Sequence, residues 1–193
     1  MNGSIEYYNK TSDALLLEKP LAPSTGFENA ISNLGGMRNQ GIEIDLHSTN
    51  INTKDFTWTT DFNIAFNNNK ITSYPQKEEV VGTKIRTVGY SIYEFYMQEW
   101  AGVDPVNGDP LWYMDVTDDK GNPTGERTTT NTYSKATKYK LGSALPSATG
   151  GLTNTVSWKG VDFSFMFTYG FGGKIYDVYE ENLLNDGNKT GYQ

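Results

Sequence analysis

The residues best placed for chemistry are His47 and the two carboxylates near it, Glu43 and Asp45. His47 is the only histidine, and the even spacing puts all three side chains on one face of a strand. One imidazole with flexible carboxylates is a weak metal site, and no apolar residues enclose the acids as general acid–base catalysis requires. We expect a hydrated polar wall here, with no metal, no cofactor and no enzyme activity.

A second acidic pattern imitates part of a calcium-binding loop: Asp115, Thr117, Asp119 and Gly121. The glycine comes one position late for an EF-hand and no glutamate closes the site, so the pattern favours a turn. We predict a hairpin with strands at 111–116 and 124–130. The chain contains no cysteine, which excludes a thiolate metal site and a disulfide framework.

Aromatic residues in a long polar stretch are the candidates for substrate contact: Tyr90, Tyr93, Tyr96, Trp100, Trp112 and Tyr113. Aromatic faces stack on sugar rings or pack against peptide side chains, so an external loop bearing them could line a substrate cavity. The alternative is that the rings pack on one another and hold the loop together. The sequence leaves both open.

Two segments that alternate strictly must position these residues. One apolar face of residues 56–66 and one of residues 161–171 contain a single polar residue, Thr60. Eleven residues of tilted strand cover about 25 Å, the height of the apolar band of an outer-membrane barrel. We predict that these side chains face lipid: Phe56, Trp58, Phe62, Ile64, Phe66, Val161, Phe163, Phe165, Phe167 and Tyr169. Aromatic girdles at the strand ends are expected from Trp58, Trp158, Tyr169 and Phe171.

Each alternating segment has a predicted partner strand. Residues 148–158 pair with 161–171 through a two-residue turn at Lys159 and Gly160, so that Trp158 lies opposite Val161. Residues 41–48 pair with 56–66 through a turn at 52–55. If both apolar faces point the same way, the turn has an odd number of residues and these pairs form: Leu46 with Thr60, Ile44 with Phe62, and Ile42 with Ile64.

The connections alternate in length along the chain. A short first strand at 3–10 is followed by a long connection at 11–39, in which 13–17 form a helical turn or an apolar lip. Another long connection spans about 67–147, and a polar one runs from Gly172 to Gln193. Reversal of direction at every connection puts all tight turns at one end of the sheet and all long loops at the other, as in outer-membrane barrels.

These patterns predict an all-β fold: a portion of an antiparallel up-and-down transmembrane β-barrel, with about five long strands and long extracellular loops. A β-sandwich that binds carbohydrate through Trp100 and Trp112 is the alternative. A net charge of −7 and the absence of a Lys/Arg cluster argue against nucleic acid as partner. The densest apolar run, Ala14–Leu17, is far shorter than a membrane-spanning helix.

Several segments in order resemble the SusC/RagA-type TonB-dependent outer-membrane transporters of Bacteroidetes-like bacteria. They are 6–10, 33–43, 58–71, 102–109, 145–154 and 159–173. The resemblance implies import of oligosaccharides or peptides across the outer membrane, with a SusD-like surface lipoprotein and energy from a TonB complex.

The resemblance also implies that residues 1–193 are one partial region late in the barrel, about five of its roughly twenty-two strands. The plug domain, the TonB box, the signal peptide and the terminal strand would lie outside it. Because the smallest barrels have about eight strands, we expect two unpaired edges and aggregation of the isolated piece.

Overall fold

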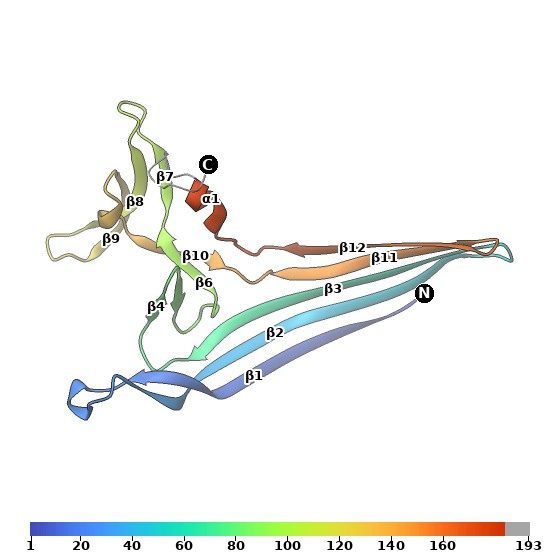
Figure 1. Ribbon diagram of the computed structural model, residues 1–193, viewed down its shortest axis with the longest axis horizontal. Coiled ribbons are helices and arrows are strands. Elements are labelled where there is room, and N and C mark those ends of the chain that lie inside the picture. Colours follow the sequence, from blue (N-terminus) through green and yellow to red (C-terminus); the bar gives the residue numbers. More distant parts are fainter. Residues whose placement is uncertain (184–193) are drawn as a thin grey trace.

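The computed structural model describes residues 1–183, and the last part of the predicted final connection, 184–193, lies outside them. A five-stranded antiparallel sheet with the order β1-β2-β3-β11-β12 spans most of the length of the molecule (Figure 1). Its strands are β1 (Asn2–Pro20), β2 (Asn29–Asn52), β3 (Phe56–Ser73), β11 (Ala148–Trp158) and β12 (Val161–Phe171). As expected, β1 and β12 are the two edges of this sheet.

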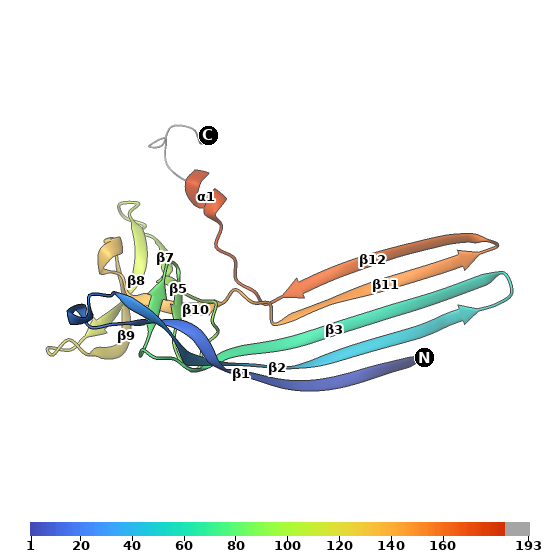
Figure 2. The same cartoon turned by 60° about the horizontal axis from the view of Figure 1, so that its bottom comes forward.

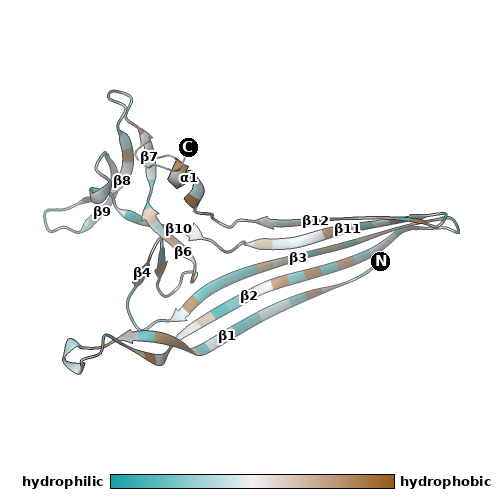
Figure 3. Cartoon of the chain, in the orientation of Figure 1, coloured by the Kyte–Doolittle hydropathy of each residue, from teal (hydrophilic) through white to brown (hydrophobic). Residues whose placement is uncertain are grey.

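The register places every residue of the two predicted apolar faces on the same side of the sheet. One row runs across all five strands and contains Gly3, Leu46, Phe62, Leu152 and Phe167. Residues directly opposite in antiparallel pairs share a face, and side chains alternate along each strand. The alternation of hydrophobic and hydrophilic residues is visible along β2 in Figure 3. One face is therefore mainly apolar, interrupted by a polar row of Ser48, Thr60 and Asn154, and the other face is polar.

The apolar face is not covered by a second sheet in the described part of the chain. Phe163 and Phe167 are each 62% exposed, and Phe165, in the middle of β12, is 39% exposed. Figures 1 and 2 show the five strands as a single curved layer. A sandwich would bury these rings between two sheets, so the sandwich alternative is wrong.

Tight turns and long connections are sorted to opposite ends of the sheet, as predicted (Figure 1). The β2–β3 and β11–β12 turns lie at one end, whereas the segments between β3 and β11 lie at the other. Lys159 and Gly160 both have positive φ, 46° and 86°, which a two-residue hairpin turn of the primed type requires. The predicted β11–β12 pairs, from Trp158 with Val161 onward, are confirmed.

The β2–β3 register differs from the prediction by two residues. Leu46 lies opposite Phe62, not Thr60, although both apolar faces do point the same way. The loop between the paired residues Asn52 and Thr57 has an even number of residues, which by itself would put the two apolar faces on opposite sides of the sheet. A bulge that inserts one extra residue between Thr49 and Ile51 brings them back to the same side. The turn alone therefore does not set the register.

The predicted long connection at 11–39 is wrong, because β1 and β2 stay paired as far as Pro20 and Asn29. Only residues 21–28 connect them, with a short 3-10 helix, η1 (Pro23–Thr25). The segment 13–17 is neither a helical turn nor a loop lip but strand, with a bulge where Ala14 has a φ of 55°. Likewise β3 does not end at 67–69 but continues to Ser73. Backbone pairing continues through polar sequence because ladder hydrogen bonds do not depend on side-chain polarity.

The segment between β3 and β11 folds into two small sheets. A four-stranded sheet has the order β10-β6-β5-β4, and a three-stranded sheet has the order β7-β8-β9. Their strands are β4 (Glu79–Val81), β5 (Lys84–Arg86), β6 (Glu94–Gln98), β7 (Trp100–Val103), β8 (Pro110–Thr117), β9 (Pro123–Thr130) and β10 (Lys138–Ser143), with the 3-10 helix η2 (Tyr133–Lys135) before β10. The predicted hairpin is β8–β9. We call residues 74–147 the external subdomain.

A small buried core joins the external subdomain to the end of β3. Ile85 is fully buried, and Ile71 and Phe95 are nearly so. The carboxylate of buried Glu94 accepts a hydrogen bond of 2.9 Å from the backbone N–H of Gly142. After β12 the chain forms one short helix, α1 (Val178–Leu183). None of the described helices is long and apolar enough to cross a membrane.

Two tyrosines reach across a glycine to the central strand β3. Tyr169 on β12 covers Gly150 on β11, and its hydroxyl donates a hydrogen bond of 2.8 Å to the carbonyl of Asn63. On the opposite face Tyr8 covers Gly41 in the same way and bonds to β3. A side chain at either glycine would collide with the ring and with the backbone of β3. These two contacts brace β3 from both faces.

We predict that Gly150→Ala destabilises the barrel region, because its new methyl group meets the carbonyl of Asn63 and the ring of Tyr169. The cost expected for such overpacking is about 1–3 kcal/mol. Heat-modifiable gel mobility and urea unfolding of the full-length receptor in detergent measure it. The matched control is Gly151→Ala, whose methyl group meets nothing closer than 3.5 Å. Equal stability of the two variants would contradict the bracing role.

Candidate functional site

The six predicted contact residues are divided between the two small sheets and do not form one patch. Tyr96 lies on β6 and Trp100 on β7, whereas Trp112 and Tyr113 are neighbours on β8. Tyr90 and Tyr93 precede β6. Alternation along β8 separates Trp112 from Tyr113, so these two rings take part in different clusters.

The first cluster is built around Trp112. Its ring makes edge-to-face contacts with Trp100 and Tyr133, at centroid distances of 5.8 and 5.2 Å. Tyr133 belongs to η2 and was not among the predicted residues; nothing in its local sequence marks it. The outer rings remain open to solvent, since Trp100 is 54% and Tyr133 51% exposed. Trp112 thus holds the cluster together and its neighbours offer free aromatic faces.

The second cluster surrounds Arg127, which sequence reasoning also missed. The guanidinium lies over the ring of Tyr139 at 4.0 Å and near that of Tyr113 at 5.9 Å, and it pairs with Glu99 at 3.1 Å. The hydroxyl of Tyr139 donates to Asp115 at 2.6 Å. Burial, together with this carboxylate, raises the pKa of Tyr139. The guanidinium and the Tyr139 hydroxyl are thus paired with carboxylates, and the ring of Tyr113 packs near the guanidinium.

Of the remaining predicted rings, Tyr96 is half-buried, whereas Tyr90 and Tyr93 are exposed. Tyr90 and Tyr93 are 41% and 47% exposed, and the ammonium of Lys140 lies 4.1 Å from the ring centroid of Tyr90. The alternative in which the rings pack on one another thus describes part of the aromatic set. Trp112 and Tyr113 pack the external subdomain, whereas Trp100, Tyr90 and Tyr93 present the surfaces on which substrate contact stays a prediction.

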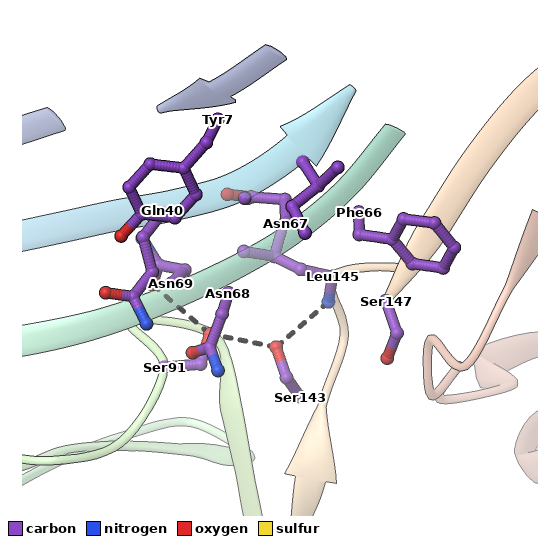
Figure 4. Close-up of a pocket in the computed structure, with 12 residues that line it drawn as sticks. Tyr7, Gln40, Phe66, Asn67, Asn68, Asn69, Ser91, Ser143, Leu145 and Ser147 are labelled. Atoms are coloured by element: carbon purple, nitrogen blue, oxygen red, sulfur yellow. Dashed lines mark hydrogen bonds between the residues drawn. The ribbon is translucent and has the colours of Figure 1, made fainter. Parts of the chain in front are cut away.

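A polar hollow of about 520 Å³ lies at the fork where β3 and β11 separate (Figure 4). The two strands pair up to Phe66 and Ala148, beyond which β3 bends away from the chain that leads into β11. The lining of the hollow is rich in amides and hydroxyls: Tyr7, Gln40, Gly41, Ile42, Phe66, Asn67, Asn68, Asn69, Ser91, Ser143, Leu145 and Ser147. No charged side chain belongs to it.

One side of this hollow fixes the external subdomain to the sheet. The side-chain oxygen of Asn69 accepts hydrogen bonds from the hydroxyl of Ser91 and from the backbone N–H of Ile92, at 3.4 and 3.0 Å. Ser143 donates to Ser91 at 2.8 Å and accepts from the N–H of Leu145 at 3.0 Å. Dashed lines in Figure 4 mark the bonds that join Asn69, Ser91, Ser143 and Leu145.

The polar face carries the histidine that opened the sequence argument. His47 lies directly opposite Asp61, and its Nδ1 is 2.6 Å from a carboxylate oxygen of Asp61. Both side chains are about half exposed. Within residues 1–183 no group of three His, Cys, Asp or Glu side chains is arranged to hold a metal ion. His47 is thus paired on the polar wall, with Asp61 as a partner on the neighbouring strand.

The acidic pattern near Asp115 forms a turn, as predicted. Its organising group is Asp118, which accepts hydrogen bonds from the backbone N–H groups of Lys120 and Asn122. The bonds from Asn122, together with the other N–H groups of the turn, lower the pKa of the Asp118 carboxyl. The hydrogen bonds of this carboxylate therefore stabilise the turn of the β8–β9 hairpin.

The arrangement defines the class of protein. A single-layer, up-and-down antiparallel sheet with one apolar and one polar face, and with its turns sorted by end, is an arc of a membrane-spanning β-barrel. With two free edges, the arc does not close within the described residues.

Comparison with known proteins identifies the kind of barrel. TonB-dependent receptor P26 of Formosa agariphila is 30% identical over 96% of this chain and 20% of its own length, and SusC of Bacteroides thetaiotaomicron is 28% identical over 96% and 19%. The solved RagAB peptide importer in its open-open state matches 89% of this chain and 18% of its own, with 28% identity and a TM-score of 0.77. No protein-family profile matches.

The chain belongs to the SusC/RagA-type TonB-dependent receptors, and it is a portion of the barrel of such a receptor. It spans about a fifth of the length of the relatives that it matches. The resemblance read from the sequence is confirmed.

We predict that Trp112→Ala loosens the three-stranded sheet, because this ring joins Trp100 to Tyr133. Truncating a packed tryptophan costs about 3–5 kcal/mol. Limited proteolysis of the full-length receptor should then cut within the external subdomain at much lower protease concentration. Trp100→Ala is the control, and with half of its ring already exposed it should change cleavage little. Equal resistance of wild type and Trp112→Ala would contradict the packing role.

Proposed function

We propose that this chain supplies part of the wall and outer rim of an outer-membrane transporter that imports oligosaccharides or peptides. Its mechanism is ligand capture and gated passage. Support comes from the similarity to SusC and to the RagAB peptide importer, the first named as a TonB-dependent receptor and the second as an importer of peptides.

The observation that carries the proposal is the exposed apolar face. Lipid is the occupant we propose for it, with Phe56, Trp58, Phe62, Ile64 and Phe66 on β3 and Val161, Phe163, Phe165, Phe167 and Tyr169 on β12 in contact with acyl chains. At roughly 25 cal/mol for each Å² of apolar surface, leaving such a face in water is strongly unfavourable. Hydrocarbon removes that cost, and the hydrogen-bonded strands satisfy the backbone.

The opposite face is proposed to line the transport path. It carries the acidic residues Glu6, Glu43, Asp45, Asp61 and Asp162. Glu6 and Glu43 lie directly opposite one another, and like charges in this position repel. Water or a positively charged group on this face reduces that repulsion. An acidic wall repels polyanions, so neutral or basic cargo fits it better.

The partners follow from the family. We propose that the external subdomain, residues 74–147, meets a SusD-like lipoprotein and substrate at the cell surface, with Trp100, Tyr90 and Tyr93 as contact residues. TonB would act on parts of the receptor outside this chain. Residues 1–193 would then be one partial barrel region late in the receptor, in the outer membrane of a Bacteroidetes-like bacterium.

We predict that Phe165→Arg impairs insertion of the full-length receptor, because it places a charge on the lipid side near the middle of β12. The expected cost is about 2–4 kcal/mol. The yield of heat-modifiable receptor in the outer-membrane fraction measures it. The matched control is Met166→Arg, one residue along on the polar face, which should insert normally. Normal insertion of both variants would show that this face does not touch lipid.

Transport itself is tested by growth. A strain lacking the full-length receptor should lose growth on at least one oligosaccharide or peptide supplied as sole carbon source, and wild-type receptor should restore it. The expected loss reflects cargo too large for general diffusion pores. Unchanged growth over a broad panel of both substrate classes would count against nutrient import.

A further inference from the structure

On the proposed lipid side of the five-stranded sheet, the side chains change from apolar to amide to cationic in three successive rows toward the long connections. The last apolar row contains Tyr7, Ile42 and Phe66. The next row on the same face contains Asn9, Gln40 and Asn68, and the row after that contains Thr11, Arg38 and Lys70. The register has no bulge between these rows, so all nine side chains share the proposed lipid side.

The amide row lies at the depth of the lipid headgroups, and the cation row lies at their outer edge. Asn68 lies two residues and Lys70 four residues beyond Phe66 on β3. At about 3.3 Å per residue and a tilt near 45°, they are roughly 5 and 9 Å above the apolar band. The headgroup layer occupies about 5–8 Å on each side of the hydrocarbon, and long cationic side chains extend within it.

The two cations oppose each other without a counter-ion. Arg38 and Lys70 are direct cross-strand partners, and like charges in that position repel. Neither forms an ion pair with any described residue, although Asp13 lies on the same face near Gly36 in the next row. Arg38 is moreover half-buried. An anion held between the two side chains would remove this repulsion.

The row below offers hydrogen bonds next to a space. The side-chain amides of Gln40 and Asn68 border the hollow at the fork and make no side-chain hydrogen bond with described residues, so each keeps donors and an acceptor free (Figure 4). The floor is Tyr7, Ile42 and Phe66, which continue into the apolar face. From bottom to top the site is apolar, then amide, then doubly cationic.

We propose that these three rows of side chains form a binding site for one anionic lipid of the outer leaflet. The cations take a phosphate or carboxylate of the headgroup, the amides take its hydroxyl or amide groups, and an acyl chain lies on the aromatic floor. The inference rests on the proposed placement of the sheet in the membrane. A free anion would use only the cations, and it would gain nothing from the apolar floor.

The test measures lipid retention by the full-length receptor, purified in neutral detergent and titrated with lipid A, a phosphorylated glycolipid, under native mass spectrometry. Wild type should bind it, and the double variant Arg38→Gln/Lys70→Gln should bind at least about tenfold more weakly, because each cation near a membrane surface contributes about fivefold in affinity. Phosphatidylcholine, with no net charge, should bind weakly to both.

The matched control is Lys10→Gln/Lys54→Gln, which removes two charges elsewhere. Lys10 lies at the same height on the polar face, and Lys54 lies in the turn at the far end of the sheet. This variant should bind lipid A as wild type does. Heat-modifiable mobility checks that each variant folds, and the single variant Lys70→Gln, whose side chain is exposed, replaces the double one if that fails.

Three outcomes overturn the inference: equal lipid A binding by wild type and a folded Arg38→Gln/Lys70→Gln variant, equal binding of the neutral lipid, or displacement of lipid A by millimolar inorganic phosphate, which would mark a site for free anions. Each leaves the transporter proposal intact as long as the receptor still inserts in the outer membrane. Failure of wild type to insert would defeat both.

Discussion

A polypeptide that crosses hydrocarbon must satisfy all of its backbone hydrogen bonds within itself, and in this protein that requirement is met strand against strand. Residues 37–49 of β2 pair with β3 without a register shift. The pairing of β3 with β11 and of β11 with β12 has no register shift either. Because side chains alternate, that continuity keeps the predicted apolar residues of β3 and β12 on one face. The lipid contact, the polar wall and the step of charges above the band all depend on it.

Much of this arrangement could be predicted from local sequence. Strands 148–158 and 161–171 have the predicted bounds, because Lys159 and Gly160 fix the hairpin and the aromatic alternation fixes the faces. The bulge at Asn50 could not be foreseen, since an extra residue in a polar stretch leaves no periodic signal. The extensions of β1, β2 and β3 were missed because glycines and asparagines normally mark loops.

The candidate site was harder to predict than the barrel wall. The sequence singles out the aromatic residues as candidates, but their division into a Trp112 cluster and an Arg127 cluster depends on which strands pair across the external subdomain. Tyr133 and Tyr139 join these clusters from segments with no aromatic pattern of their own. The opposition of Arg38 and Lys70 was hidden for the same reason, because a cross-strand pair between residues so far apart is a property of register.

The central claim is that alternate residues of β12 face lipid and pore. In a full-length receptor cleared of any native cysteine, single cysteines placed one at a time at 161–171 can each carry a nitroxide label. Collision rates with oxygen, which concentrates in lipid, and with a water-soluble nickel chelate are then compared. The account predicts high oxygen collision at odd positions and high nickel collision at even positions. Collision rates that do not alternate, or that alternate in the opposite phase, would contradict it.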